Sequence, residues 1–152
     1  MTRTYLLTPI GWVRRAGEHQ VIEVAAVYEP ALLGIGSNSH LWIIYWFHEH
    51  DNPQDRSLLQ VHPCRQPANP LTGVFGTRAP VRPNPIGLCA VRLLRLEGLR
   101  LFVTGLDARD GTPVIDIKPY LPSSDVIHEA AAPALLPATA AGSGVQNLQR
   151  EE

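Results

Sequence analysis

The sequence is short of lysine, cysteine and long apolar runs. Lys118 is the single lysine beside twelve arginines, and the net charge of −1 excludes a global basic field that could hold a polyanion. The only cysteines, Cys64 and Cys89, form no C-x-x-C pair and are too few for a disulfide framework. No run of about 18 apolar residues predicts a membrane-spanning helix. No signal-peptide pattern follows Met1, so we expect a cytoplasmic, reduced protein with no membrane partner.

Several well-known catalytic and nucleotide-binding motifs are also missing. The chain has no G-x-G-x-x-G after a strand, no P-loop and no G-x-S-x-G, and its strands do not alternate with helices. These absences exclude a Rossmann-type methyltransferase, a P-loop enzyme and an α/β-hydrolase.

Proline and glycine are plentiful, and they predict short strands joined by tight turns. The chain of 152 residues holds 14 prolines and 12 glycines, spread so that no long helix fits between them. The pattern indicates a mainly β protein: a small antiparallel or mixed β-barrel with little helix and an irregular C-terminal tail. Residues 1–125 would form the barrel, and residues 126–152 a short helix and an Ala-, Pro- and Gly-rich tail. The strands are expected at 5–13, 20–28, 40–47, 57–62, 88–96, 99–106 and 114–117, with a helix from a cap at 123–125 to residue 132.

Three clusters of unusual composition lie between Gly73 and Tyr120. In the central one, Pro83 and Pro85 exclude helix and central strand and stiffen the loop that carries Arg82 and Asn84. Such a loop suits substrate binding by Arg82 and Asn84, although a plain proline-stiffened crossover explains it equally well. The flanking clusters are G-V-F-G-T-R at 73–78 and D-A-R-D-G-T-P at 107–113, the latter followed by D-I-K-P-Y at 116–120.

Histidines follow the most apolar strand and raise the question of a metal. His48 and His50 would share one face of an extended strand, and so would His62 and Cys64. An H-x-H pair alone is a weak signal, and no third ligand follows at a diagnostic spacing. We therefore expect no metal site, and a single histidine lining a pocket at the end of the strand.

Together these clusters resemble the TsaA-like (TrmO) family, whose members N6-methylate threonylcarbamoyladenosine in certain tRNAs. The resemblance runs from about Thr8 to Asp125 and rests on several motifs in the family order. They are I-G at 10–11, S-H-L-W at 39–42 with F-H at 47–48, G-V-F at 73–75 with T-R at 77–78, R-P-N-P-I-G at 82–87, D-G-T-P-V at 110–114 and D-I-K-P-Y at 116–120.

The resemblance implies a homodimeric β-barrel methyltransferase with S-adenosylmethionine bound near the dimer interface. Carried over by motif, the cofactor-binding residues would be His48, Arg78, Leu88, Leu106 and Asp107. Methyl transfer to an amine also releases a proton, and Asp110 or His48 could accept it as the catalytic base. The sequence does not choose between these two.

Two departures from the family bear on the substrate. A Pro-Arg-Gln loop that touches the cofactor in the tRNA enzymes is absent, since Arg14-Arg15-Ala16-Gly17-Glu18-His19 leads directly into a strand. A longer C-terminal region is replaced by the alanine-rich tail. Three functions therefore stay open: methylation of tRNA, methylation of a small molecule by the same fold, and a non-catalytic module that binds S-adenosylmethionine.

A homodimer is also predicted from the strand at 40–47 and from the tail. The strand is apolar on both faces, so a second subunit could cover the outer face unless the same chain does so. The tail from Ala130 has too little apolar surface to order by itself, which suggests that a partner subunit holds it.

Overall fold

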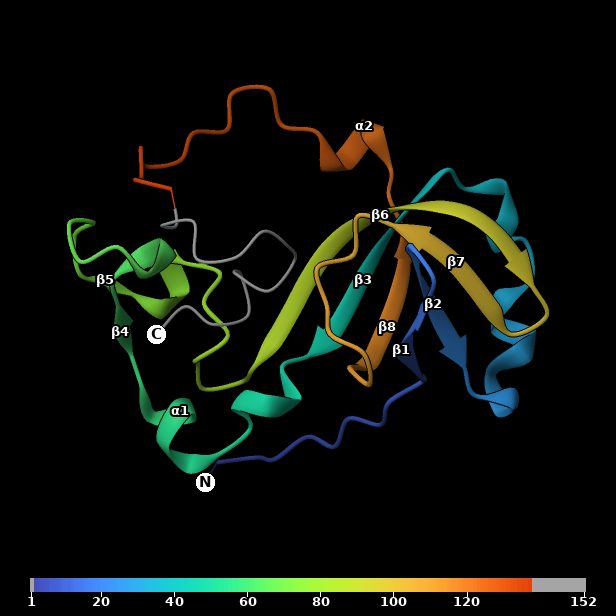
Figure 1. Ribbon diagram of the computed structural model, residues 1–152, viewed down its shortest axis with the longest axis horizontal. Helices are drawn as coiled ribbons and strands as arrows, with labels where there is room; N and C mark the ends of the chain where they lie inside the picture. The colour runs from blue at the N-terminus through green and yellow to red at the C-terminus, as the bar shows by residue number, and fades with distance from the viewer. Residues whose placement is uncertain (1, 138–152) are drawn as a thin grey trace.

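Six strands close into an antiparallel barrel in the computed structural model, which describes residues 2–137 (Figure 1). The order around the barrel is β1-β2-β7-β6-β3-β8, and every neighbouring pair is antiparallel. The prediction of a small, mainly β barrel is confirmed. The strands are β1 (Gly11–Ala16), β2 (His19–Val24), β3 (His40–Trp46), β6 (Ile86–Glu97), β7 (Arg100–Thr104) and β8 (Pro113–Pro119).

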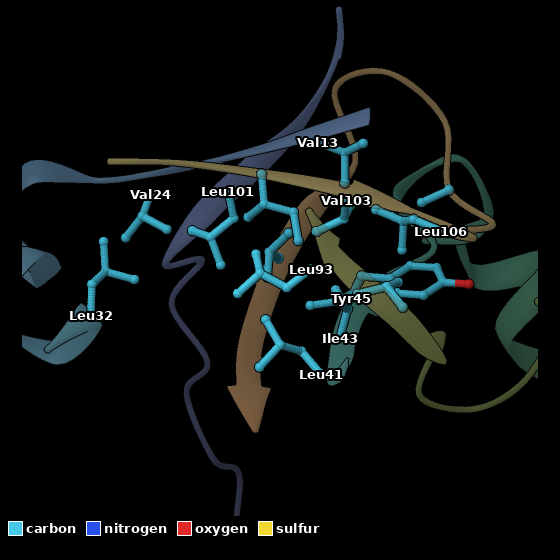
Figure 2. Close-up of a cluster of buried hydrophobic side chains, with 14 of the residues drawn as sticks. Val13, Val24, Leu32, Leu41, Ile43, Tyr45, Leu93, Leu101, Val103 and Leu106 are labelled. Carbon is cyan, nitrogen blue, oxygen red and sulfur yellow. The ribbon is translucent and has the colours of Figure 1, made fainter. Parts of the chain in front are cut away.

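Alternating apolar residues fill the barrel interior, because successive side chains of a strand point to opposite faces. On β3, Leu41, Ile43 and Tyr45 are buried while the residues between them are half-buried. Figure 2 shows these side chains meeting those of the other strands inside the barrel, with Leu32 closing one end from the 3-10 helix Ala26–Leu32. The interior is therefore a packed core, and ligand sites lie outside it.

The predicted strand limits are wrong at the N-terminus. β1 begins at Gly11 instead of Tyr5, and β2 ends at Val24 instead of Tyr28. Residues 2–8 are exposed and extended and form no strand, and we call them the N-terminal arm. Gly11 pairs with Val24 of β2, and glycine is required there because a Cβ would collide with the carbonyl oxygen of Glu23.

A small lobe is inserted between β3 and β6 and projects from the barrel (Figure 1). It contains α1 (Pro53–Ser57), the two-stranded sheet of β4 (Gln60–Val61) and β5 (Thr72–Gly73), and 3-10 turns at His48–His50, Pro63–Arg65 and Val74–Gly76. A separate core supports it, made of Val61, Val74, Ala79 and Val81. The sequence did not predict α1, which Asn52 caps by accepting a hydrogen bond from the Asp55 N–H at 2.9 Å.

The C-terminal segment differs from the prediction of a helix reaching residue 132. The helix α2 spans only Pro122–Asp125, and residues 126–137 form neither helix nor strand. The Asp125 carboxylate accepts hydrogen bonds from the Leu121 N–H at the start of the helix and from the Trp42 indole, both at 2.8 Å, so it joins α2 to β3. The predicted tail beyond residue 137 lies outside the described residues.

The same chain makes contacts to the described part of the tail, and the role of a partner subunit in ordering it stays a prediction. The buried Asn69 side chain accepts from the Leu136 N–H at 2.9 Å and donates to the Leu136 carbonyl at 3.2 Å. Residues 126–137, which we call the strap, arch from α2 on the barrel back to the lobe (Figure 1). No helix within residues 2–137 has the length and apolarity to cross a membrane.

Candidate functional site

A cavity of about 450 Å³ lies where the lobe meets the barrel. This size suits a cofactor or a small ligand. The lobe contributes Thr77, Arg78, Arg82 and Asn84, and the barrel contributes most of the apolar wall. The barrel residues are Trp42, Tyr45, Phe47, Ile86, Gly87, Leu88, Cys89, Ala90 and Asp107.

Gly87 allows the Tyr45 ring to lie close against β6, and both residues line the cavity on the barrel side, which we call its floor. The two residues are opposite in the β3–β6 register, and a Cβ on Gly87 would lie 2.5 Å from the Tyr45 ring. Tyr45 then donates a hydrogen bond to the Asp107 main-chain carbonyl at 2.8 Å. The β-barrel is thereby joined to the segment that follows β7, which carries Asp107 into the cavity.

Arg82 shapes the loop before it. Its guanidinium donates to the main-chain carbonyls of Thr77 at 3.2 Å, Ala79 at 3.0 Å and Val74 at 3.3 Å. Partial burial also lowers the pKa of Arg82 from its usual value. Arg82 therefore acts mainly as a brace, although its side chain does line the cavity as the substrate role requires.

Arg78 is the cavity's available cation. It sits in the loop braced by Arg82, is exposed, and takes part in no hydrogen bond or ion pair within residues 2–137. A guanidinium left free in this way can bind a carboxylate or phosphate through two parallel hydrogen bonds.

The other ionisable groups of the floor favour their neutral forms. Burial, followed by the nearby Cys89 and Asp107, raises the pKa of Tyr45 well above its usual value. Burial likewise raises the pKa of the Cys89 thiol, which donates to the Gly105 carbonyl at 3.1 Å. Besides these two groups, the ionisable residues that the structure places in the cavity lining are Arg78, Arg82 and Asp107.

The cavity brings together only part of the predicted site. Arg78, Leu88, Asp107, Arg82 and Asn84 line it, with Leu88 46% exposed. Leu106 does not, because its side chain is 1% exposed and packs in the barrel core. The adjacent Asp107 lines the cavity instead, in the segment that follows β7.

The two candidate bases, Asp110 and His48, also lie outside the cavity lining. Asp110 accepts a hydrogen bond from the Arg15 N–H at 2.9 Å, so it joins the D-G-T-P turn to the β1–β2 hairpin. His48 is exposed in a 3-10 turn, not in the extended strand that we expected. Their catalytic roles stay predictions.

Sequence reasoning missed three residues that organise the site. Trp42 and Tyr45 were recognised only as strand residues, and Arg56 was not singled out. Arg56 donates to the Pro83 carbonyl at 2.8 Å and to Asp51 at 2.9 Å, which fixes the R-P-N-P loop from α1. The aromatic run at 40–47 was the available signal for the first two. No local pattern marks Arg56, because its partner is 27 residues away.

Two of the histidines considered as metal ligands make other contacts in the structure. His50 pairs with Asp55 at 2.9 Å, and His62 bonds to the Asn69 carbonyl at 2.8 Å. Residues 2–137 contain no group of three or more histidine, cysteine, aspartate or glutamate side chains placed to hold a metal ion.

The fold and cavity define a small-barrel protein with a ligand site at one side, and sequence comparison places it in a family. Residues 8–126 match the family described as the tRNA-methyltransferase O N-terminal domain. The chain therefore belongs to the TrmO family, as its motifs suggested.

Individual relatives agree with this assignment. A "probable S-adenosyl-L-methionine-binding protein" of Pyrococcus horikoshii is 40% identical over 114 residues, which cover 75% of this chain and 81% of that protein. A mouse "tRNA (adenine(37)-N6)-methyltransferase" is 42% identical over 97 residues, covering 64% of this chain but 22% of the mouse protein. The crystal structure of TrmO from Pseudomonas aeruginosa aligns with a TM-score of 0.69 at 31% identity, over 89% of this chain and 64% of that one. This chain thus spans less than two thirds of the solved TrmO chain.

Proposed function

We propose that the protein is an S-adenosylmethionine-dependent methyltransferase that modifies N6 of an adenine in tRNA. The observation that carries the proposal is the lobe–barrel cavity, which joins the unengaged Arg78 to an apolar wall in a chain of the TrmO family. The names of the relatives from P. horikoshii and mouse support the cofactor and the substrate, respectively.

The residues of the cavity fit the chemical groups of the cofactor. Arg78 would hold the methionyl carboxylate through its guanidinium fork. Leu88 and Trp42 offer apolar surface to the adenosine, and the Asp107 carboxylate suits the positive sulfonium. His48 and Leu106, also predicted as contacts, do not line the cavity in the single chain.

The cofactor supplies an electrophilic methyl group when bound. The chain's own task is to hold the acceptor amine in line with the sulfur–carbon bond and to keep water away. Transfer of that methyl group to the amine nitrogen would release S-adenosylhomocysteine and one proton from the amine. Asp110 or His48 would take that proton directly or through water.

The finer substrate assignment is threonylcarbamoyladenosine, the modified adenosine on which TrmO-like tRNA enzymes act. We extend the proposal to it on family membership alone. The tight β1–β2 turn, where Ala16 pairs with His19, does not contain the Pro-Arg-Gln loop of those enzymes, so a small-molecule acceptor is the competing function. A tRNA substrate implies a cytoplasmic protein, since that compartment supplies both tRNA and the cofactor.

We also propose that the protein is a homodimer. The outer face of β3 supports a dimer interface less than the sequence indicated. Trp42 packs on Tyr120 with ring centroids 5.3 Å apart, and Trp46 bonds to Asp51, so this chain covers part of that face. The support comes instead from Phe75, which is 81% exposed in the loop beside Arg78, together with the half-exposed Leu88. Light scattering at micromolar concentration tests this, and a mass near 16.7 kDa would contradict it.

Two measurements test the function. Calorimetry on EDTA-treated protein should show binding of S-adenosylmethionine or S-adenosylhomocysteine without added metal. Mass spectrometry of tRNA nucleosides from a deletion strain should show loss of the N6-methyl form of the modified adenosine, restored by the wild-type gene. Cofactor binding with an unchanged tRNA profile would favour the small-molecule acceptor, and no binding would contradict the proposal.

A further inference from the structure

A second and larger cavity, of about 800 Å³, lies under the N-terminal arm. We call it the arm cavity. In Figure 1 the arm, in dark blue, runs from β1 toward α1 and does not join the barrel sheet. The residues that matter in its lining are Arg3 and Tyr5 of the arm, Trp46 of β3, Arg56 of α1, and Asn84 and Ile86 at the start of β6.

The arm cavity and the cofactor cavity share a wall. Asn84 and Ile86 line both. Trp46 pairs with Ile86 in the β3–β6 register, and Leu88 is two residues along β6, so these three side chains lie on one face of the sheet. A flat group beside Trp46 would therefore lie next to the ligand beside Leu88.

We propose that the arm cavity is the acceptor side of the methyl-transfer site and takes an adenine base together with its flanking phosphates. This inference rests on the proposed function, because it needs a methyl donor in the neighbouring cavity. It adds the place where the RNA binds and the residues that hold it.

Aromatic surface suited to a base is held in place on the β-sheet side. The Trp46 indole N–H donates to Asp51 at 3.0 Å, and the Arg56 guanidinium carbon lies 6.0 Å from the centre of the indole ring. Tyr5 supplies a second ring from the arm and is 76% exposed. Aromatic side chains that line one groove bind unpaired bases by stacking, with little dependence on base identity.

Base identity and phosphate binding come from two other residues. Arg56 Nη2 donates to Asn84 Oδ1 at 3.4 Å, which leaves the Asn84 amide N–H₂ to donate to a ring nitrogen of adenine. Arg56 is thus a positioning residue. Arg3 pairs with no carboxylate within residues 2–137 and lies over Tyr5 at 5.6 Å, so its charge is available to a phosphate.

Steady-state kinetics with tRNA from the deletion strain test the role of the arm. Arg3→Ala and Tyr5→Ala should each raise KM for tRNA by about tenfold and leave the calorimetric Kd for S-adenosylhomocysteine unchanged. Leu6→Ala is the matched control, because Leu6 is 93% exposed on the same arm and does not line the cavity. The arm is exposed and carries no strand, so these variants should fold as the wild type does.

Binding of a fluorescent RNA stem-loop with adenine at the target position gives a second readout. Trp46→Phe and Arg56→Gln should weaken it at least fivefold, and Arg56→Gln should also reduce the preference for adenine over uridine there. Wild-type KM and RNA affinity in the arm variants would overturn the inference while leaving the proposed function intact. Absence of S-adenosylhomocysteine binding by the wild-type protein would instead overturn the proposed function.

Discussion

Arg78 and Arg82 lie four residues apart and line the same cavity, yet their removal should have different consequences. Arg78→Ala should weaken the cofactor's binding and leave the fold unchanged, because no hydrogen bond or ion pair within residues 2–137 depends on its guanidinium. Loss of a charge-assisted contact on an exposed side chain costs about 1.5 to 2 kcal/mol, or about 10- to 30-fold in Kd. The Kd of Arg78→Lys should lie between those of the wild type and Arg78→Ala, because an ammonium keeps the charge but cannot form two parallel hydrogen bonds.

Arg82→Ala should instead lower the stability. It removes hydrogen bonds to the carbonyls of Val74, Thr77 and Ala79. Three such bonds, at under 1 kcal/mol each for a partly exposed group, amount to about 2 kcal/mol and a fall in Tm of about 4 to 8 °C. Cofactor affinity should drop as well, as a consequence of the loosened loop.

Calorimetric titration with S-adenosylhomocysteine and thermal unfolding of all three variants separate the two roles. The reasoning requires that Arg78→Ala change Kd without changing Tm, and that Arg82→Ala change Tm. If Arg78→Ala binds as tightly as the wild type, Arg78 is not the carboxylate ligand. If Arg82→Ala unfolds at the wild-type temperature, its three carbonyl contacts do not brace the loop.

Three further predictions concern packing, the strap and pH. Gly87→Ala should destabilise the protein by about 1 to 3 kcal/mol in urea unfolding, because the new methyl group displaces the Tyr45 ring; Tyr45→Phe should be milder, and a neutral Gly87→Ala would contradict the close approach. Asn69→Ala should release the strap at Leu136 and speed its cleavage by a protease, with little change in Tm if the barrel is independent of it. The Asn52 amide, and after it His50, hold the pKa of Asp55 below its usual 3.8. Its contribution to stability is therefore complete above about pH 4 and is lost as the pH falls through the lower folded value, and Asp55→Asn should flatten that part of the stability profile.

The cofactor cavity could be predicted only in part from the sequence. The motifs identified Arg78, Leu88 and Asp107, because each lies in a short pattern whose spacing is local. The R-P-N-P loop was predicted as rigid for a reason that needs no partner, since Pro83 and Pro85 restrict the backbone by themselves. The motif placed Leu106 in the site as well, but its side chain packs in the core. Neighbouring residues of an extended segment point to opposite sides, so an assignment that is one residue off selects a core residue in place of a cavity residue.

The sequence by itself determined the class of fold. Short apolar runs separated by Gly and Pro predict strands that pack into a small barrel, and the most apolar of them became β3 within one residue of its expected end. The turn between β6 and β7 falls at Gly98, whose φ of 59° is a conformation that glycine adopts easily.

Tertiary structure alone decided what each side chain touches. Arg82 became a brace and Arg78 a free cation because of carbonyls that the folded loop turns toward one of them. Asp110 was bound to the β1–β2 hairpin, 95 residues earlier in the chain, and the strap was held by Asn69, 67 residues before Leu136. Such contacts join segments that no local pattern relates, so they exist only once the barrel has closed and brought those segments together.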